Sequence, residues 1–379
     1  MDNRALRSLR LAVLGVLIFI SCALVIHRAS AQNTASTTVA AEKTVDQTQK
    51  NIQVLKGLPE SQLVPVMNYI GASLGVRCNY CHVNKGGTWD FASDEKGEKA
   101  SARKMITMVK DINKGSFNGN TEVTCYTCHR GRTGPMSTPQ LPIAEASPRP
   151  DRGAPGADQP RPTLPTADEI LTKYTAALGG AANIDKLKSR ISKGTVVGAN
   201  GNSFNYELYQ SSPEKVLAVI TGQQGETQRG FNGTTGWEKG VRGLRDLSAE
   251  EVYFLRRYPD MVKDVKLKDQ FTRLSVGGKQ KINDRDVYVL RGLTTAGRRE
   301  QLFFDAETGL LVRRVSSVAT PVGNVPEQVD FEDYRDVDGV KMPFTVKVSS
   351  VDSFYSVTRT FTDIKVNVPI DEKRFNKPG

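Results

Sequence analysis

The sequence predicts an α+β multidomain fold, with a small all-α part followed by a larger part of mostly antiparallel strands and a few helices. Three observations support this fold class. The 379 residues suit two domains of about 150 residues each. Apolar residues recur at helical spacing in the first third of the chain and alternate in short runs beyond residue 200. A hydrophobic content of 38% excludes a disordered tail and a multi-span membrane protein.

Residues 1–31 have the layout of an export signal. Three arginines precede an uncharged run over residues 11–26, and small residues follow it. The run is shorter than the roughly 20 residues that span a bilayer comfortably. Cleavage after Ala31 is therefore favoured, with an uncleaved membrane anchor or lipidation at Cys22 as the alternatives. Each route places the protein in the periplasm, soluble or tethered to the outer face of the cytoplasmic membrane.

Residues 44–136 are predicted to form the helical part. Two stripes of apolar residues have helical spacing, one ending at Gly75 and one beginning after Ser93. The first stripe is Leu63, Val66, Met67, Ile70 and Leu74, and the second is Ala102, Met105, Met108, Val109 and Ile112. Half of the 18 prolines then fall between Pro135 and Pro165, which predicts an extended, solvated linker over residues 137–165.

Residues 166–379 are predicted to form the β-rich part. Capping boxes at Thr166–Glu169 and Ser248–Glu251 predict two helices, the first ending at residues 179–180 and the second running near residues 253–258. Short alternating runs separated by turn signals predict antiparallel strands. These runs include Phe204/Tyr206/Leu208, Val287/Val289, Leu302/Phe304 and Val346/Val348.

Four of the five cysteines and two of the three histidines fall in two five-residue clusters. The clusters are Cys78-Asn-Tyr-Cys81-His82 and Cys125-Tyr-Thr-Cys128-His129. Both match the pattern of covalent haem attachment, in which two thiols three residues apart bond one porphyrin and the next histidine binds its iron. The sequence therefore predicts two covalently bound haem c groups, with His82 and His129 as iron ligands.

Two other kinds of site use paired cysteines. A structural zinc site is disfavoured because 43 residues separate the two pairs, more than the roughly 15 to 20 of a zinc ribbon. Zinc also needs no histidine after each pair. Disulfides or a thiol-redox motif would suit an oxidising compartment, but they would leave both histidines without a role.

The second axial ligand of each iron is predicted to be a methionine. The remaining histidine, His27, lies in the export segment, and a thioether is the next ligand that suits haem iron. Met67 lies on the first helical stripe and Met108 on the second, with Met105 as the alternative and Met136 as a weaker candidate. A methionine on an apolar stripe also fills cores, which is the competing interpretation.

The stretch from Asn51 to Pro135 resembles the haem-binding half of the photosynthetic reaction-centre cytochrome c subunit family. The resembling segments are LPESQLVPVMNYIGASLGVRCNYCH, DFASDEKGEKASARKMITMVKDIN and VTCYTCHRG. In that family a helix supplies a methionine and a turn then leads to the cysteine cluster. The resemblance implies Met67 with His82 on one haem, and a methionine of the second helix with His129 on the other. That subunit carries four haems, whereas this sequence has two clusters.

The C-terminal part resembles, more loosely, periplasmic lipoprotein-carrier domains. These domains are open half-barrels of antiparallel strands that shelter acyl chains, so the resemblance implies an open half-barrel and a lipid as a ligand of this part. The cues are Gly179-Gly180, the stretch from Phe231 to Trp237, Phe304-Asp305 to Leu310-Leu311, and Asp336 to Phe344.

Together these patterns predict an exported electron carrier and not an enzyme. Its expected partners are redox proteins, either a membrane electron-transfer complex or a soluble cytochrome. A haem enzyme or gas sensor with an open sixth position, and a lipid or lipoprotein carrier with auxiliary haems, remain alternatives. The 52 basic against 41 acidic residues form no basic block interleaved with aromatics, which excludes nucleic acid as a partner. We expect few contacts between residues 44–136 and 166–379.

Overall fold

The structure is a computed structural model that describes residues 42–135 and 164–379, except for 224, 242, 249–250, 253–254, 257–266, 296 and 352–355. Residues 43–379 form one compact unit. The predicted export segment, with Cys22 and His27, lies outside the described residues, as do Met136 and the predicted linker up to residue 163. Among the described helices, none combines the length and apolar composition needed to span a membrane.

The N-terminal segment contains the two predicted helices. Helix α3 spans Leu63–Leu74 and ends at Gly75, whose φ of 68° is the left-handed conformation that terminates helices. Helix α4 spans Gly97–Ser116. Shorter elements complete the segment: α2 (Val45–Thr48), η1 (Glu60–Gln62), η2 (Cys78–Tyr80) and α5 (Cys125–His129).

The prediction of an all-α N-terminal part needs one correction. Strands β1 (Val83–Lys85) and β2 (Thr88–Asp90) form an antiparallel hairpin between the first cysteine cluster and α4. Gly86 and Gly87 make its turn, both at positive φ, which glycine adopts without steric cost. Each strand has three residues, too few to show a recognisable alternation in the sequence.

The buried face of α4 also differs from the predicted one. Ile106, Val109 and Asn113 are buried, whereas Met105 and Met108 are 46% and 44% exposed. The prediction that both methionines lie on the buried stripe is therefore wrong. The buried stripe starts one residue later, because Ile106 and Val109 together offer a better apolar face than the two methionines.

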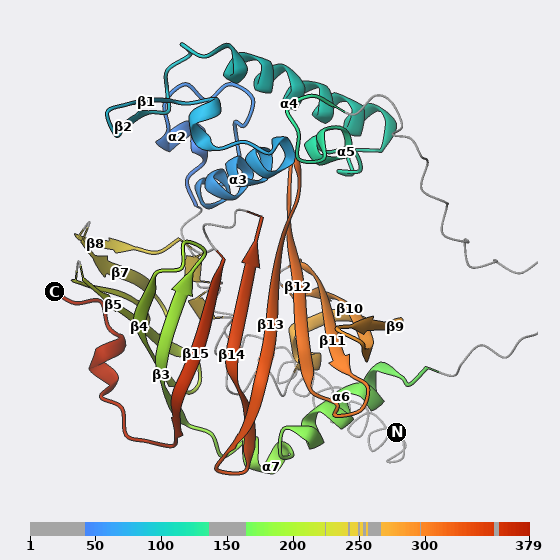
Figure 1. The fold of residues 1–379 in the computed structure, drawn as a ribbon, viewed down its shortest axis with the longest axis vertical. Coiled ribbons are helices and arrows are strands. Elements are labelled where there is room, and N and C mark those ends of the chain that lie inside the picture. Colours follow the sequence, from blue (N-terminus) through green and yellow to red (C-terminus); the bar gives the residue numbers. More distant parts are fainter. Residues whose placement is uncertain are drawn as a thin grey trace, which may run out of the picture. The chain divides into compact units, whose positions relative to one another are not determined.

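The C-terminal part is one open antiparallel sheet of 13 strands, as the sequence predicts (Figure 1). The strand order is β8-β7-β6-β5-β4-β3-β15-β14-β13-β12-β11-β10-β9, so only the β3–β15 pair joins strands distant in sequence. The strands are β3 (Ser189–Gly198), β4 (Ser203–Ser211), β5 (Lys215–Gly222), β6 (Gly225–Phe231), β7 (Gly236–Gly240), β8 (Gly243–Asp246), β9 (Phe271–Ile282), β10 (Arg285–Thr294), β11 (Arg299–Asp305), β12 (Leu311–Thr320), β13 (Gly323–Val337), β14 (Val340–Ser350) and β15 (Val357–Val366).

The first capping box of the C-terminal part is confirmed. Helix α6 (Ala167–Ala177) begins where the Thr166 hydroxyl accepts a hydrogen bond from the Glu169 amide, and the Glu169 carboxylate accepts one from the Thr166 amide. The remaining short helices are α7 (Ala181–Ile184), η3 (Leu267–Gln270) and η5 (Glu372–Phe375). The Ser248–Glu251 box also makes both of its bonds, although most of the helix predicted after it lies outside the described residues.

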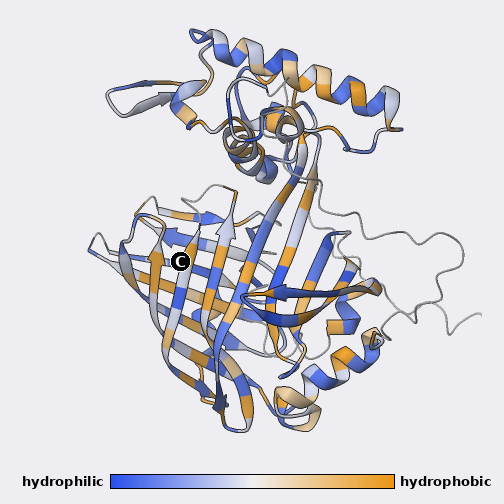
Figure 2. Ribbon diagram, turned by 45° about the vertical axis from the view of Figure 1, so that its right-hand side comes forward, coloured by the Kyte–Doolittle hydropathy of each residue, from blue (hydrophilic) through white to orange (hydrophobic). Residues whose placement is uncertain are grey.

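The main core lies between one face of the sheet and α6. Tyr174 of α6 packs edge to face against Phe304 of β11, with ring centroids 5.2 Å apart. The predicted alternation puts Leu302, Val346 and Val348 in this same core. Figure 2 shows the alternation as orange and blue bands along the strands.

A second, smaller core joins the N-terminal segment to the sheet. The buried residues of this small core are Val45, Leu55, Leu58, Val66, Tyr69, Ile106 and Val322. Val322 lies in the turn between β12 and β13 and is completely buried, and the Thr121 hydroxyl donates to the Thr320 carbonyl of the same turn at 3.5 Å. The expectation of few contacts between the two parts is therefore wrong at this hairpin.

Candidate functional site

The first cysteine cluster forms a single tight helical turn. Cys78 begins the 3₁₀ element η2, and its carbonyl accepts hydrogen bonds from the amides of Cys81 at 3.3 Å and His82 at 2.9 Å. Residues three apart in a 3₁₀ turn lie directly above one another. The two thiols therefore share one side of the turn. Both are free, with Cys78 exposed and Cys81 half-buried.

The second cluster forms the short helix α5. Thr124 caps it, since its hydroxyl accepts from the Thr127 amide at 3.3 Å while the Thr127 hydroxyl accepts from the Thr124 amide at 3.0 Å. Cys125 and Cys128 are three residues apart and so lie on the same helix face. Arg130 ends the helix in the left-handed conformation. This local structure presents the second pair of free thiols in the same way as the first.

Burial raises the pKa of the Cys81 and Cys125 thiols above the ordinary value. At both positions burial therefore favours the neutral thiol over the thiolate.

His129 makes one hydrogen bond through its ring. Its Nδ1 lies 3.0 Å from the carbonyl oxygen of Arg132. Because a carbonyl can only accept a hydrogen bond, Nδ1 carries a proton, which in the neutral imidazole leaves the lone pair on Nε2. Histidines that bind metals usually make this kind of bond through the second ring nitrogen.

His82 is held mainly by aromatic contacts. The Phe91 ring meets the imidazole edge to face at a centroid distance of 5.2 Å, and Trp89 stacks on Phe91 at 5.4 Å. Nδ1 of His82 is shielded from solvent and has no hydrogen-bond partner among the described residues. Burial, and then the charge of Lys99, lower the pKa of His82, while the Phe91 carbonyl opposes this shift.

The end of α3 and the end of α5 are locked together by two glycines. A Cβ atom on Gly75 would stand 2.2 Å from the Gly131 carbonyl oxygen, and the Gly131 amide donates to the Ser73 carbonyl at 2.8 Å. The helix that leads to the first cluster thus contacts the turn that follows the second.

The candidate methionines have different environments. Met67 is partly buried and packs against the small core together with Cys125, a residue of the second cluster. Met105 and Met108 are exposed on α4. Met67 therefore packs against the small core, whereas the thioethers of α4 are open at the surface.

Asn113 is a residue of the site that the sequence did not reveal. Its buried amide donates to the Val123 carbonyl at 2.7 Å and accepts from the amides of Glu122 and Val123 at 3.1 and 2.9 Å. It thereby fixes the segment that leads into Thr124 and the second cluster. The available signal was a polar residue four positions after Val109, on the buried face of α4.

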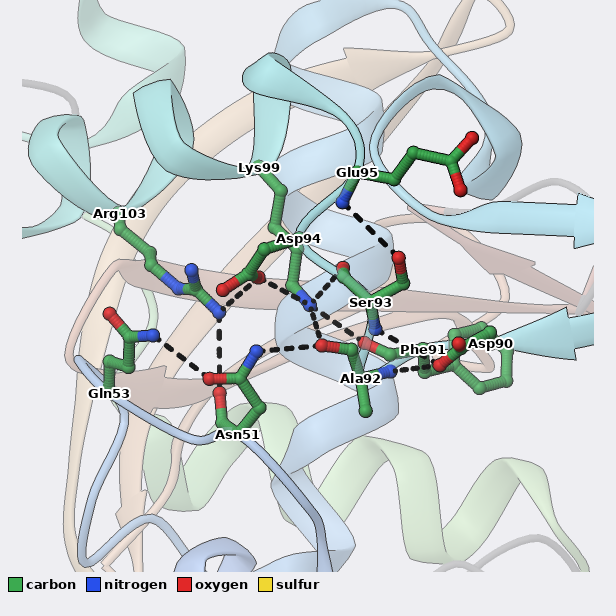
Figure 3. Close-up of polar contacts among 10 residues, drawn as sticks. All are labelled: Asn51, Gln53, Asp90, Phe91, Ala92, Ser93, Asp94, Glu95, Lys99 and Arg103. Carbon is green, nitrogen blue, oxygen red and sulfur yellow. Dashed lines mark hydrogen bonds and ion pairs between the residues drawn. The ribbon is translucent and has the colours of Figure 1, made fainter.

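A second unrecognised group holds the segment after the first cluster (Figure 3). The Lys99 ammonium donates to the carbonyls of Phe91, Ala92 and Ser93 at 2.9, 3.0 and 2.8 Å. Asp94 lies 3.2 Å from Lys99 and 2.9 Å from Arg103. We define the Lys99 network as Lys99, Asp94 and Arg103 with Asn51, whose amide donates to the Ala92 carbonyl at 2.7 Å.

The N-terminal segment exposes several large apolar side chains. Eight large apolar side chains of residues 42–135 are exposed, although this segment is shorter than the part of the chain that forms the sheet. These are Val64, Tyr80, Trp89, Phe91, Met105, Met108, Phe117 and Tyr126. Isolated exposed apolar residues are ordinary, but a concentration of aromatics and thioethers indicates a binding surface. Together with paired thiols and an Nε2 lone pair, these residues fit covalently bound haem.

Comparisons with known proteins find relatives of the segment that holds the two clusters. The sequence model of the photosynthetic reaction centre cytochrome c subunit family matches residues 22–151. Cytochrome c-554 of Chloroflexus aurantiacus is 40% identical over 87 residues, which cover 21% of this chain and 20% of that protein. The reaction center cytochrome c subunit of Thermochromatium tepidum is 39% identical over 92 residues, covering 23% of this chain and 21% of the relative. The chain thus spans about a fifth of the length of these relatives.

Two solved structures are similar to over half of the chain. A LolA superfamily protein from Nitrosomonas europaea has a TM-score of 0.41 at 13% identity and covers 56% of this chain and 99% of its own. A DUF1329 family protein from Desulfovibrio piger has a TM-score of 0.41 at 11% identity. The match covers 55% of this chain and 96% of the neighbour's chain. The segment that holds both cysteine clusters resembles the photosynthetic reaction-centre cytochrome c subunit family.

Proposed function

We propose that this protein is a c-type cytochrome that carries single electrons and holds one haem c at each cysteine cluster. The observation that carries the proposal is the repeated geometry of the clusters. Each presents two free thiols from one face of a single helical turn, with a histidine directly after them. Haem c supplies a one-electron iron couple when it is bound.

The residues of the chain would divide the work of holding the cofactors. Cys78 and Cys81 would form the thioether bonds at the first cluster, and Cys125 and Cys128 those at the second. His82 and His129 would bind iron through Nε2. The Arg132 carbonyl keeps the His129 ring in the required tautomer.

The sixth positions are proposed to be taken by thioethers. Met67 would serve one haem, and Met108, with Met105 as the alternative, would serve the other. The exposure of Met105 and Met108 supports this proposal, because a thioether that serves only to fill a core would be buried. Met67 is partly buried against the small core, on which Cys125 also packs.

The partners are proposed to be redox proteins in the periplasm, either a membrane electron-transfer complex or a soluble cytochrome. The similarity to reaction-centre cytochrome subunits supports an exported electron carrier. It covers only the segment with the clusters, so the role of the sheet within the whole protein is part of the proposal.

The test is a reductive titration of the protein produced with a c-type maturation system. We expect two one-electron steps, low-spin spectra in both oxidation states, and rapid electron exchange with a soluble cytochrome. Immediate binding of carbon monoxide by the reduced protein would instead favour an enzyme or gas sensor with an open sixth position. Lipid that stays bound through purification would instead favour a lipid or lipoprotein carrier with auxiliary haems.

A further inference from the structure

The Lys99 ammonium closes a turn of three consecutive carbonyl groups. It donates to the carbonyls of residues 91, 92 and 93, all within 3.0 Å. A lysine ammonium has three donors, so these bonds use all of them. Figure 3 shows the three carbonyls converging on Lys99 from the segment that follows β2.

Lys99 occupies an unfavourable position for a cation. It is the third residue of α4, where the helix dipole disfavours positive charge. Its side chain is also only 12% exposed, and burial of an ammonium has a desolvation cost. The contacts with the turn and with Asp94 offset both costs. A merely solvated surface lysine would have neither the burial nor these contacts.

The turn held by Lys99 is the part of the chain that packs on His82. The Phe91 ring meets the imidazole at a centroid distance of 5.2 Å, and the Phe91 carbonyl accepts a hydrogen bond from Lys99 at 2.9 Å. The solvent-shielded Nδ1 of His82 has no hydrogen-bond partner among the described residues. Lys99 therefore holds the residue whose ring packs on His82.

We propose that Lys99 is a positioning residue for His82 that raises the reduction potential of the haem bound there. This inference rests on the proposed function, because it requires haem at the first cluster. The ammonium charge disfavours the more positive ferric state. The bonds of Lys99 to the turn also hold Phe91, whose ring packs on His82.

Asp94 supplies an internal control of opposite sign. Its carboxylate lies 3.2 Å from the Lys99 ammonium and compensates part of that charge. Asp94→Asn should therefore raise the potential of the same haem, whereas Lys99→Met should lower it. If Lys99 had no electrostatic role and both substitutions only loosened the turn of residues 91–93, the potential would move in the same direction in both variants.

The experiment is a spectroelectrochemical titration of the dihaem protein and its variants. Lys104→Met is the matched control, because Lys104 is an exposed lysine on the same helix. We expect Lys99→Met to lower one midpoint potential beyond the change seen in the control, to leave the other midpoint in place, and to alter the electron paramagnetic resonance g-values of one ferric haem only. Lys99→Gln keeps two donors without the charge and should lower the same midpoint, which preserves the test if Lys99→Met does not fold.

Haem content separates this proposal from the proposed function. Absence of haem from the wild-type protein contradicts the proposed function itself. Two haems in every variant, with midpoints in Lys99→Met and Lys99→Gln equal to those of Lys104→Met, would overturn the role of Lys99 alone. A fall in the same midpoint in both Lys99→Met and Asp94→Asn would also overturn it.

Discussion

The Tyr69 ring lies so close to Gly323 that a Cβ atom added at the glycine would stand 2.5 Å from the tyrosine Cζ and Oη atoms. Tyr69 belongs to α3, the helix that carries Met67, and Gly323 begins β13. Burial raises the pKa of the Tyr69 hydroxyl, as expected for a ring enclosed by both segments. The β12–β13 hairpin is therefore a structural component of the N-terminal module.

Val322→Ala tests this contact. Removal of two buried methyl groups should lower the free energy of unfolding by about 2 kcal/mol. Because Val322 lies in the small core with Tyr69 and Val66, the loss should appear in urea unfolding followed by haem absorbance. Val241→Ala, at a 73% exposed position, is the control and should change nothing. Equal haem unfolding midpoints in the two variants would contradict the structural role of the hairpin.

Met67→Leu tests the thioether as a ligand. Leucine has nearly the same volume, so stability should change by less than about 1.5 kcal/mol, but it cannot bind iron. One midpoint potential should fall, and the reduced protein should bind carbon monoxide. Met342→Leu, a substitution at a buried methionine of the sheet, should leave both midpoints unchanged. If Met67→Leu behaves as this control does, Met67 only fills the core.

The haem served by Met67 can be identified in a single-haem background. In a Cys125→Ala/Cys128→Ala double variant only the first cluster can attach haem. If Met67 pairs with His82, Met67→Leu should still lower the remaining midpoint. If that midpoint does not move, while Met67→Leu lowers a midpoint of the dihaem protein, Met67 serves the second cluster.

Asn113→Ala tests the support of the second cluster. The substitution leaves the Val123 carbonyl and two amides without their buried partner, which should cost roughly 1 to 3 kcal/mol of folding free energy. Cys125 and Cys128 should then be less well positioned for haem attachment. Peptide mass spectrometry should therefore find less haem on this cluster than on the first. Asn120→Ala, at an exposed position in the same segment, should retain full occupancy at both clusters. Equal haem occupancy of the two clusters in the Asn113→Ala variant would show that Asn113 does not support the second cluster.

The pH dependence of stability tests Asp94. Hydrogen bonds from Arg103 and Asn51 hold the pKa of this carboxyl well below its usual range. A folded-state pKa below the unfolded value gives stability that is complete above the unfolded pKa of about 4 and is lost as the pH falls through the folded value. The difference in urea midpoint between wild type and Asp94→Asn should therefore be constant from pH 7 to about pH 5 and shrink below about pH 4. A difference that persists unchanged at pH 2 would contradict the shifted pKa.

The features predictable from the sequence were those that depend on local spacing. Gly75 ended its helix, the Thr166–Glu169 box opened another, and the alternating runs became strands of one antiparallel sheet. The roles of Lys99 and Val322 could not be predicted, because each depends on a segment distant in structure or in sequence. Met105 and Met108 were misplaced because two apolar stripes on α4 overlap, and packing selects the one with Ile106.

Intact-chain mass spectrometry after acid-acetone extraction tests the central claim most directly. Thioether bonds survive extraction, so the protein made with a c-type maturation system should be heavier than its polypeptide by about two haem masses. Cys78→Ala/Cys81→Ala should remove one of them. A mass equal to the bare polypeptide would contradict the account.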